Sequence, residues 1–557
     1  MASTETISPA KQSSSERLEG LALPLLFIIA CLLYLPGLGS YGPLDPTDSF
    51  FIEGARELFE TKQYLLPMFN YQIWLDKPIL YFWLVVACYK ILGVSAFAGR
   101  LASALSAVAT GLVIYAGAKR TLGIRQAFAA ALIFLSFPLV SVIGHESLTD
   151  MTLTFLMTSA LLGFYNYLSK PSWPVIILAY LALGLAFLCK GPVAVVIVAA
   201  IVFLYFCALA DYSDFKSFVA SIWQNTLRLR PFSGLGIMLA VNLPWYTAAT
   251  LQTKGAFLYA FFITQNFGRM AGKVNHIEPF WYYIPVIAGG LFPLNLILFS
   301  RYDAFVSAIK NRKASGDKPQ ALVFFALVWA LLVLVLFGAI KTKLATYILP
   351  AMPPLAMLTA YSLFYWLKVG SAKKLAPSAL FFIIAGIAGL VVPHVVKASW
   401  VMVMLREQSL LLILTIIVGI AYGLLLLKNK AIPAFALLLL SAAVGVGICV
   451  PVGHRVFYNE VHRPFEVMIE KVIADQAMIA TVVTEEPSIS YFLHRHIDVL
   501  NTPLEARAYL ERRQLNGSQL APHYVLVPQK CLKDMEWFPA GAVELSKIRK
   551  WTLFKLN

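Results

Sequence analysis

Long apolar runs, separated by short polar segments, fill most of the chain between residues 20 and 451. A membrane-spanning helix needs about 20 mainly apolar residues. Thirteen segments reach that length, approximately 20–39, 98–118, 126–144, 151–169, 173–189, 191–210, 233–251, 281–300, 321–340, 345–366, 375–395, 409–427 and 431–451. A shorter run, 79–89, is predicted to lie along the membrane surface as an interfacial helix. The pattern predicts a polytopic α-helical membrane protein with about 13 transmembrane helices.

The composition agrees with a protein that resides in lipid. The chain is 59% hydrophobic and 13% charged, with a mean hydropathy of +0.74, whereas a soluble protein is about a quarter charged. The net charge of +16 does not indicate nucleic-acid binding, because no basic stripe or nucleic-acid-binding motif occurs. The six cysteines form no CxxC pair and predict no disulfide framework.

The loop charges predict the topology. If the N-terminus is cytoplasmic and the thirteen spans alternate, the inside loops hold Lys119, Arg120, Arg125, Lys170, Lys216, Arg228, Arg230, Arg301, Lys310, Arg312, Lys313, Lys318, Lys368, Lys373, Lys374, Lys428 and Lys430. This agrees with the positive-inside rule, and a spanning segment at 79–89 would invert every later loop. The first apolar run lacks a cleavage site and is expected to remain as an anchor. We expect a multi-pass protein of the plasma (inner) membrane with an extracytoplasmic C-terminus.

Three parts are predicted along the chain. Residues 1–18 are polar and Ser-rich and are expected to be a disordered cytoplasmic segment. Residues 19–451 form the transmembrane domain. Residues 452–557 contain helical and strand-like runs and are expected to fold as a small extracytoplasmic α/β domain. No Gly-rich phosphate loop follows its strands, so no nucleotide is expected.

The polar residues that could carry chemistry gather in the predicted outer loops. They are Asp45, Asp48, Asp76 and Lys77 in the first loop, His145, Glu146 and Asp150 in the second, Lys190 in the third, Arg269, Lys273, His276 and Glu278 in the fourth, and Lys341, Lys343 and Tyr347 in the fifth. Ionisable groups beside lipid are costly and usually functional. Their concentration on one face predicts a site at the outer membrane surface.

An ordered series of short motifs follows these loops: "DKP", the second-loop Asp, "CKGP", "NLPWY", "HIEPFWYY" and "TYILP". The series resembles the GT-C class of lipid-linked-sugar glycosyltransferases, and most closely the aminoarabinose transferase and protein O-mannosyltransferase-like family. The resemblance covers most of the membrane part and is weak in the tail. It implies a GT-C fold and transfer of a sugar from a polyprenyl-phosphate carrier to an envelope acceptor. That acceptor is a lipid A-like glycolipid, a glycan or a protein, as in lipopolysaccharide modification or protein O-glycosylation.

The resemblance also implies roles for particular residues. Family members carry a catalytic Asp in the first outer loop, usually followed by Glu. Aligned through "EGAREL", this chain has Thr47 at the Asp position and Asp48 at the Glu position. We expect Asp48 to be the general base and Asp150 to support it. The phosphate-binding residues implied are Lys77, Arg269, Tyr347, Tyr81 and Lys190, and the pair implied for a divalent metal is Asp76 and His276.

The chemistry of this transfer fits such residues. A carboxylate would accept the proton of the acceptor hydroxyl as it attacks the anomeric carbon. Lys, Arg and Tyr donors would stabilise the charge that develops on the leaving phosphate. A single displacement with one base predicts inversion at the anomeric carbon, and no nucleotide is required.

Each residue also has a structural interpretation. Asp48 and Asp150 could cap helices, Lys77 could extend its charge to the interface, Tyr347 could belong to an aromatic belt, and His276 could be structural. Two other functions stay open. A transporter or flippase of polyprenyl-linked glycans would need a polar path, and the span centres carry almost no ionisable residues. A non-catalytic relative would explain the departure at Thr47.

Overall fold

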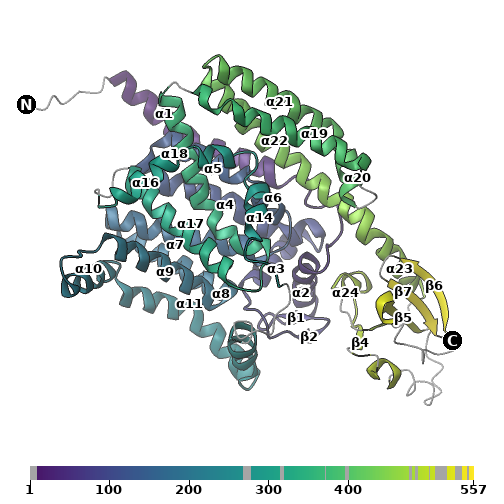
Figure 1. Ribbon diagram of the computed structural model, residues 1–557. Helices are drawn as coiled ribbons and strands as arrows, with labels where there is room; N and C mark the ends of the chain where they lie inside the picture. Colours follow the sequence, from purple (N-terminus) through teal and green to yellow (C-terminus); the bar gives the residue numbers. More distant parts are fainter. Residues whose placement is uncertain are drawn as a thin grey trace, which may run out of the picture.

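The computed structural model describes residues 9–267, 277–313, 319–369, 372–395, 400–475, 479–482, 487–500, 502, 504–508, 523–532, 542–548 and 551–556. A bundle of long helices forms most of the molecule, and a small domain containing a β-sheet lies at one end (Figure 1). The first half of the bundle contains α1 (Pro9–Tyr34), α2 (Thr47–Thr61), α3 (Leu80–Leu92), α4 (Ala96–Leu122), α5 (Ile124–Leu135), α6 (Pro138–Gly144), α7 (Thr149–Ser169), α8 (Trp173–Lys190), α9 (Pro192–Leu209), α10 (Phe215–Arg228) and α11 (Pro231–Gln252).

The second half of the bundle continues with shorter and longer helices. These are α12 (Ala256–Leu258), η1 (Tyr259–Phe267), α14 (Tyr283–Gly290), α15 (Asn295–Phe299), α16 (Tyr302–Lys310), α17 (Pro319–Ala339), η2 (Ala345–Ala351), α18 (Met352–Val369), η3 (Ala372–Leu375), α19 (Pro377–Val395), α20 (Trp400–Glu407), α21 (Ser409–Leu427) and α22 (Ala431–Phe457). A two-residue hairpin, β1 (Met68–Phe69) with β2 (Gln72–Ile73), lies between α2 and α3.

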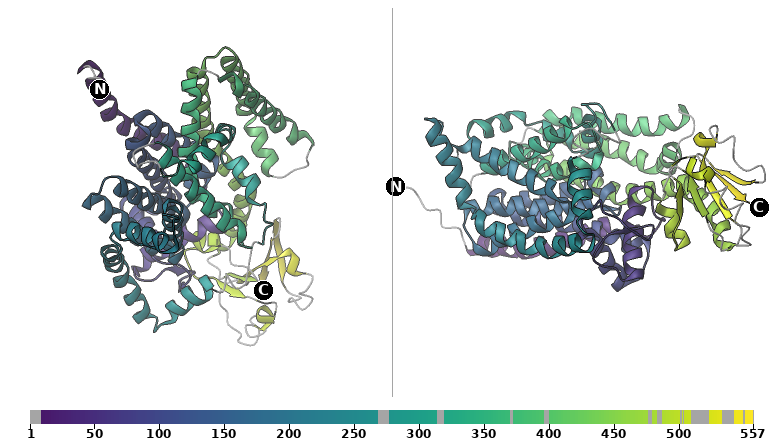
Figure 2. Two further views of the ribbon diagram at one scale, coloured as in Figure 1. Left: turned by 60° about the vertical axis from the view of Figure 1, so that its left-hand side comes forward. Right: turned by 90° about the horizontal axis from the view of Figure 1, so that it is seen from below.

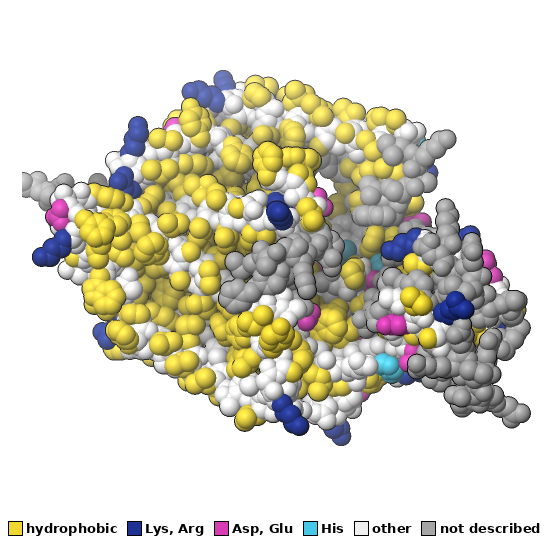
Figure 3. Space-filling view, turned by 60° about the horizontal axis from the view of Figure 1, so that its bottom comes forward, with side chains coloured by type: hydrophobic (Ala, Val, Ile, Leu, Met, Phe, Trp, Pro, Cys, Tyr) yellow, Lys and Arg dark blue, Asp and Glu magenta, His cyan; other side chains and the backbone are white. Residues whose placement is uncertain are grey.

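The helices confirm a multi-pass α-helical membrane protein. Among the described residues, nine helices are long and apolar enough to cross a membrane, or ten if the bent pair α5–α6 forms one span. In the space-filling view of Figure 3, hydrophobic side chains cover much of the visible bundle, and Lys and Arg lie mostly at its margins. A broad apolar belt with charge at its edges is the surface expected in lipid.

Two predicted segments differ from the structure. The predicted span 281–300 is divided into α14 and α15, because the turn between them contains Pro293, which lacks the N–H that a continuing helix needs. Helix α1 begins at Pro9, inside the segment 1–18 that we expected to be disordered, and residues 1–8 lie outside the described part. Helix α3, over the predicted interfacial run, has 13 residues, about 20 Å of helix, which is short for a bilayer.

The C-terminal region is a small α/β unit. It contains η4 (Tyr458–His462), α23 (Arg463–Ala474), β3 (Ile479–Val482), α24 (Pro487–Leu493), β4 (Asp498–Leu500), β5 (His523–Pro528), α26 (Gln529–Leu532), β6 (Val543–Ile548) and β7 (Trp551–Leu556). The sheet order is β4-β3-β5-β7-β6; β3 pairs in parallel with β4 and β5, and β7 pairs antiparallel with β5 and β6. Alternate residues of β3 supply two apolar clusters, one of which includes α23.

No turn separates the membrane part from this α/β unit. Helix α22 passes directly through η4 into α23, so the predicted boundary at 451/452 falls inside a continuous helical segment. Figures 1 and 2 show the α/β unit at one end of the bundle, beside α2 and the hairpin, with α10 and the start of α1 at the opposite end.

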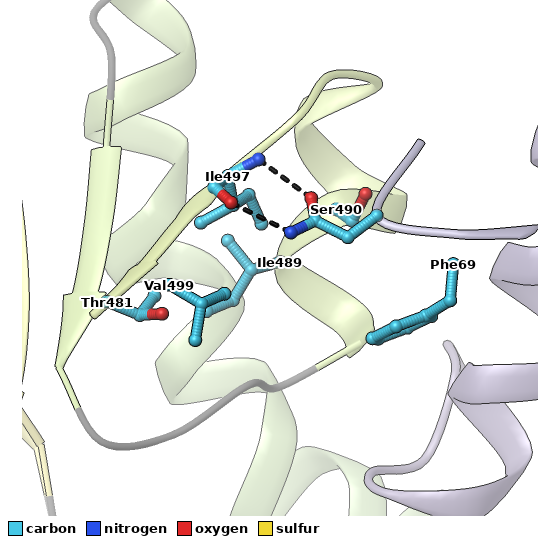
Figure 4. A pocket seen from close by; sticks show the side chains of 7 residues that line it. Phe69, Thr481, Ile489, Ser490, Ile497 and Val499 are labelled. Carbon is cyan, nitrogen blue, oxygen red and sulfur yellow. Dashed lines mark hydrogen bonds between the residues drawn. The ribbon is translucent and has the colours of Figure 1, made fainter. Parts of the chain in front are cut away.

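The first loop and the α/β unit are joined by direct polar contacts. The Asn70 side chain accepts from the Ile497 amide and donates to the Ile497 carbonyl, both at 2.8 Å. Figure 4 shows the adjoining contact, in which Phe69 lies across from Ile489, Ser490 and Ile497. These bonds give the loop a defined place against the C-terminal domain.

A second group of contacts between the loop and this domain is charged. Arg56 is fully buried, pairs with Glu53 at 2.5 Å, and donates to the Ser490 carbonyl. Burial beside Glu53 raises the pKa of Glu57 from 4.5 to about 9, so this carboxyl keeps its proton at neutral pH. Helix α2 therefore contains a buried titratable group.

Candidate functional site

Asp48, the expected general base, lies in the first turn of α2 and is 1% exposed. Its carboxylate accepts four hydrogen bonds. Arg100 of α4 donates to it twice, at 2.6 and 3.1 Å, and the amides of Leu44 and Ser147 donate at 2.9 and 2.7 Å. A carboxylate has about four acceptor positions, so the protein itself fills them.

Arg100 is equally enclosed. It is 0% exposed, and it also donates to the carbonyls of Leu38, Tyr41 and Gly42 and stacks over the Tyr41 ring at 3.8 Å. The Asp48–Arg100 pair thus ties the first loop to α4, and through Ser147 to the second loop. Buried, fully bonded ion pairs of this kind hold backbone segments in place.

Asp150 has a different environment. It lies in the first turn of α7, and its Oδ1 is 2.7 Å from Nζ of Lys190, the last residue of α8. The two side chains are 12% and 22% exposed, for Asp150 and Lys190 respectively. Its Oδ2 has one long contact, with the Thr149 hydroxyl at 3.5 Å. Lys190 also lies over the Tyr347 ring, with Nζ 5.5 Å from its centroid.

Three predicted residues therefore converge. Asp150, Lys190 and Tyr347 come from α7, α8 and η2, and they form one partly accessible charged cluster. The shared location is explained by the helix ends: each residue lies where an apolar helix begins or ends, so its polar group reaches the same face of the bundle.

Tyr81 lies elsewhere. It is fully buried in α3, its hydroxyl bonds with those of Ser103 and Ser147, and its ring packs edge-on against Phe51. These contacts place Tyr81 beneath the loops as a packing residue with a satisfied hydroxyl.

The remaining predicted residues fall into two groups. Asp76 and Lys77 precede α3 and are partly exposed, and Asp76 accepts no hydrogen bond from a described residue. Arg269 and His276 lie outside the described residues. No group of three metal-ligating side chains occurs within the described ranges, so the described donors alone do not form a metal site, and we derive no step through a metal.

Sequence reasoning gave no role to one polar pair at this end of the molecule. Glu146 Oε1 is 3.1 Å from Nε2 of His454 on α22, and Nδ1 of His454 is 3.2 Å from the Tyr41 hydroxyl. The Tyr41 hydroxyl donates a hydrogen bond to the carbonyl of His145 at 2.7 Å. The side chain of Glu146 is 23% exposed, and its second oxygen has no partner among the described residues. Glu146 immediately precedes Ser147, so it stands where the first two loops meet.

Comparisons with known proteins identify relatives of this chain. Residues 76–235 match the dolichyl-phosphate-mannose-protein mannosyltransferase family. The undecaprenyl phosphate-alpha-4-amino-4-deoxy-L-arabinose arabinosyl transferase 1 of Pseudomonas fluorescens is 27% identical over 80% of this chain and 78% of its own length. The corresponding protein of Aeromonas hydrophila is 32% identical over 68% of this chain and 66% of its own length.

The solved structures show the same fold. The crystal structure of ArnT from Cupriavidus metallidurans bound to undecaprenyl phosphate superposes with a TM-score of 0.77 at 19% identity, covering 95% of this chain and 97% of that chain. Fold and relatives together define the class, a multi-pass membrane glycosyltransferase with a lipid-phosphate-linked sugar donor. Within that class, the chain belongs to the ArnT-like family of GT-C enzymes.

Proposed function

We propose that this protein transfers a sugar from a polyprenyl-phosphate carrier to a cell-envelope acceptor, with inversion at the anomeric carbon. The observation that carries the proposal is the Asp150–Lys190 pair beside Tyr347, at the end of the bundle that holds the α/β domain. This pair would offer a cation to a lipid-borne phosphate that approaches from the bilayer. The named relatives act with undecaprenyl-phosphate aminoarabinose, so an undecaprenyl-phosphate sugar is the donor class we expect.

Lys190 is the phosphate-binding group in this proposal. An ammonium has three donors, and Asp150 occupies one of them at 2.7 Å. Two donors are left for phosphate oxygens, whose negative charge grows as the bond to the sugar breaks. Lys77 and Arg269 are proposed to complete the anion site.

Asp150 then acts on the phosphate side. In a single displacement, the attacking hydroxyl and the leaving phosphate lie on opposite faces of the sugar. Asp150 touches the phosphate-binding ammonium, so it cannot also serve the opposite face in that position. We assign it the role of holding Lys190 in place, a positioning role.

The proton acceptor must be a carboxylate with an open oxygen. Asp48 accepts four protein donors, so we assign it a positioning role in place of the expected catalytic one. Glu146 has a single described partner, His454. Three residues separate it from Asp150, so their Cα atoms lie within about 14 Å. We propose Glu146 as the general base, supported by the His454 imidazole.

The sidedness follows from the loop charges. The end that carries α10 holds the basic residues that prefer the cytoplasm, so the site faces outward and the N-terminus is cytoplasmic. The acceptor hydroxyl is therefore expected on the extracytoplasmic side. The relatives make a lipid A-like glycolipid the first acceptor to test, ahead of another glycan or a protein.

The test is direct transfer by the purified full-length protein. It is incubated with radiolabelled undecaprenyl-phosphate sugars and with lipid A, envelope glycan or envelope protein, and the wild type is compared with Lys190→Gln and Glu146→Gln. Transfer by the wild type and its loss in both variants would support the proposal. Intact protein that transfers no sugar from any donor would overturn it.

A non-catalytic relative is the second candidate, because Thr47 stands at the position of the family's catalytic Asp. It predicts that the protein binds undecaprenyl phosphate and that Lys190→Gln weakens this binding, while no variant or acceptor yields a labelled product.

A further inference from the structure

The opposite end of the bundle contains a basic pocket that the transfer reaction does not use. Two adjoining cavities, of about 340 and 380 Å³, lie between α7, α9, α10 and the residues after α16. They share Leu168 and Arg228. Their basic lining residues are Arg228, Arg230, Arg312 and Lys313. The described lining contains no carboxylate, so the pocket has a strong positive potential.

The cations of this pocket are held by neutral groups. Arg312 donates to the Ala208 carbonyl at 2.7 Å, and Arg228 makes long bonds of 3.3 Å to Asn225 and to the Leu168 carbonyl. Arg230 bonds the Tyr167 hydroxyl at 2.9 Å. Over the described part of the chain, none of the three forms an ion pair. Their charges are positioned but not neutralised, which is the state that favours an anionic ligand.

Helix α10 indicates where that ligand comes from. Four apolar side chains recur at every fourth position along it: Phe215, Val219, Trp223 and Leu227. They are 82%, 46%, 59% and 39% exposed. No residue of α10 is buried. An exposed apolar stripe on a helix between two spans is the pattern of a helix that lies in the membrane interface. The last residue of α10, Arg228, opens into both cavities, so the pocket meets the headgroup layer.

We propose that this pocket binds the phosphate headgroup of an anionic glycerophospholipid from the leaflet opposite the transfer site. The apolar stripe of α10 lies among the acyl chains, and Arg228 and Arg312 donate to the phosphate oxygens. Basic pockets between helices at the cytoplasmic face are the known form of such sites. The site would anchor the α9–α10–α11 corner of the protein to charged lipid.

The experiment uses the full-length protein in nanodiscs of phosphatidylethanolamine with a tenth of phosphatidylglycerol or cardiolipin. Native mass spectrometry after release counts the lipids retained by each protein molecule. The test variant is Arg228→Gln with Arg312→Gln. The control is Lys368→Gln with Lys428→Gln, which removes the same charge from exposed ends of α18 and α21 on the same predicted face.

We expect enrichment of the anionic lipid by the wild type and by the control pair. One basic residue contributes about fivefold to the affinity for an anionic lipid. The test variant, which lacks two, should therefore bind this lipid roughly 25-fold more weakly. Unchanged retention in the test pair, or an equal loss in the control pair, would overturn the proposal. So would displacement of phosphatidylglycerol by inorganic phosphate, or by undecaprenyl phosphate at lower concentration. Unfolding temperatures of all variants verify that each one is folded.

Discussion

Two carboxylates that the sequence placed in one catalytic group lie in opposite environments. Asp48 at the start of α2 is 1% exposed and accepts four donors, two of them from a buried arginine. Asp150 at the start of α7 is paired with one lysine and keeps an oxygen with only a 3.5 Å contact. Both occupy the first turn of a helix. They differ in their partners and in the exposure of their side chains.

The two environments distinguish a carboxylate that stabilises the fold from a carboxylate that can act on a substrate. A carboxylate whose acceptor positions are all filled by the protein cannot accept a proton without losing bonds that the fold needs. A carboxylate with one mobile partner can exchange that partner for a substrate. Glu146, bound only to His454 among the described residues, resembles Asp150 in this respect.

The largest effect is expected for Glu146→Gln. Loss of a general base lowers the rate of transfer by about 10²- to 10⁴-fold, and the unfolding temperature should change little because Glu146 is partly exposed. Transfer rates of the wild type and the variant, measured side by side, check the assignment. Asp76→Asn, which changes another outer-loop carboxylate, serves as the control. Full transfer activity in Glu146→Gln would exclude Glu146 as the general base.

Asp48→Asn should affect stability first. It leaves Arg100 buried without its carboxylate, and breaking a buried pair costs about 3 to 5 kcal/mol. Denaturant unfolding in detergent measures this loss. A double variant, Asp48→Leu with Arg100→Met, removes both charges and should recover much of the stability. If Asp48→Asn unfolds like the wild type but loses transfer, Asp48 is the base after all.

Asp150→Asn should show the reverse behaviour. It leaves Lys190 without its anchor, so we expect a loss of transfer of about 10²- to 10³-fold, the size found when one transition-state donor is misplaced. Stability should fall less than with Asp48→Asn, because Asp150 pairs with one lysine whereas Asp48 accepts four hydrogen bonds. Asp150→Asn should also weaken the binding of undecaprenyl phosphate. Measuring this binding tests whether Asp150 positions Lys190 for the phosphate. Unchanged lipid binding with lost transfer would place Asp150 on the acceptor side.

Features set by neighbouring residues in the chain could be predicted from the sequence, whereas contacts between distant residues could not. The apolar runs predicted most of the long helices, and the loop motifs predicted that Asp150, Lys190 and Tyr347 share a site. The partner of Asp48 is 52 residues away on another helix, and His454 is 308 residues from Glu146. A burial pattern cannot show which cation meets which carboxylate. The break at Pro293 was visible in the sequence, but the apolar run around it masked the signal.

The α2 interface should make stability depend on pH. Burial beside Glu53 raises the pKa of Glu57 from 4.5 to about 9. The pKa of Glu57 is higher in the folded than in the unfolded protein. Its contribution to the free energy of unfolding is therefore fully present below pH 4.5 and is lost as pH rises toward 9. Each unit of that difference corresponds to at most about 1.4 kcal/mol. Glu57→Gln should weaken the fall in unfolding temperature between pH 5 and 9. An unchanged slope would show that Glu57 is ionised in the folded protein.

The smallest effect is expected from Thr47→Asp, which restores the family's acidic residue. Thr47 is the exposed first residue of α2. An added carboxylate there favours the helix N-terminus by about 0.3 to 1 kcal/mol. Transfer should stay within a few-fold of the wild type, because Glu146 already supplies the base in our assignment. Thr47→Asn, the matched neutral variant, controls for size. A tenfold rise with Asp and not with Asn would place the base at position 47. The Asp48–Arg100 pair would then be the support that holds that position, and Glu146 would lose its catalytic role.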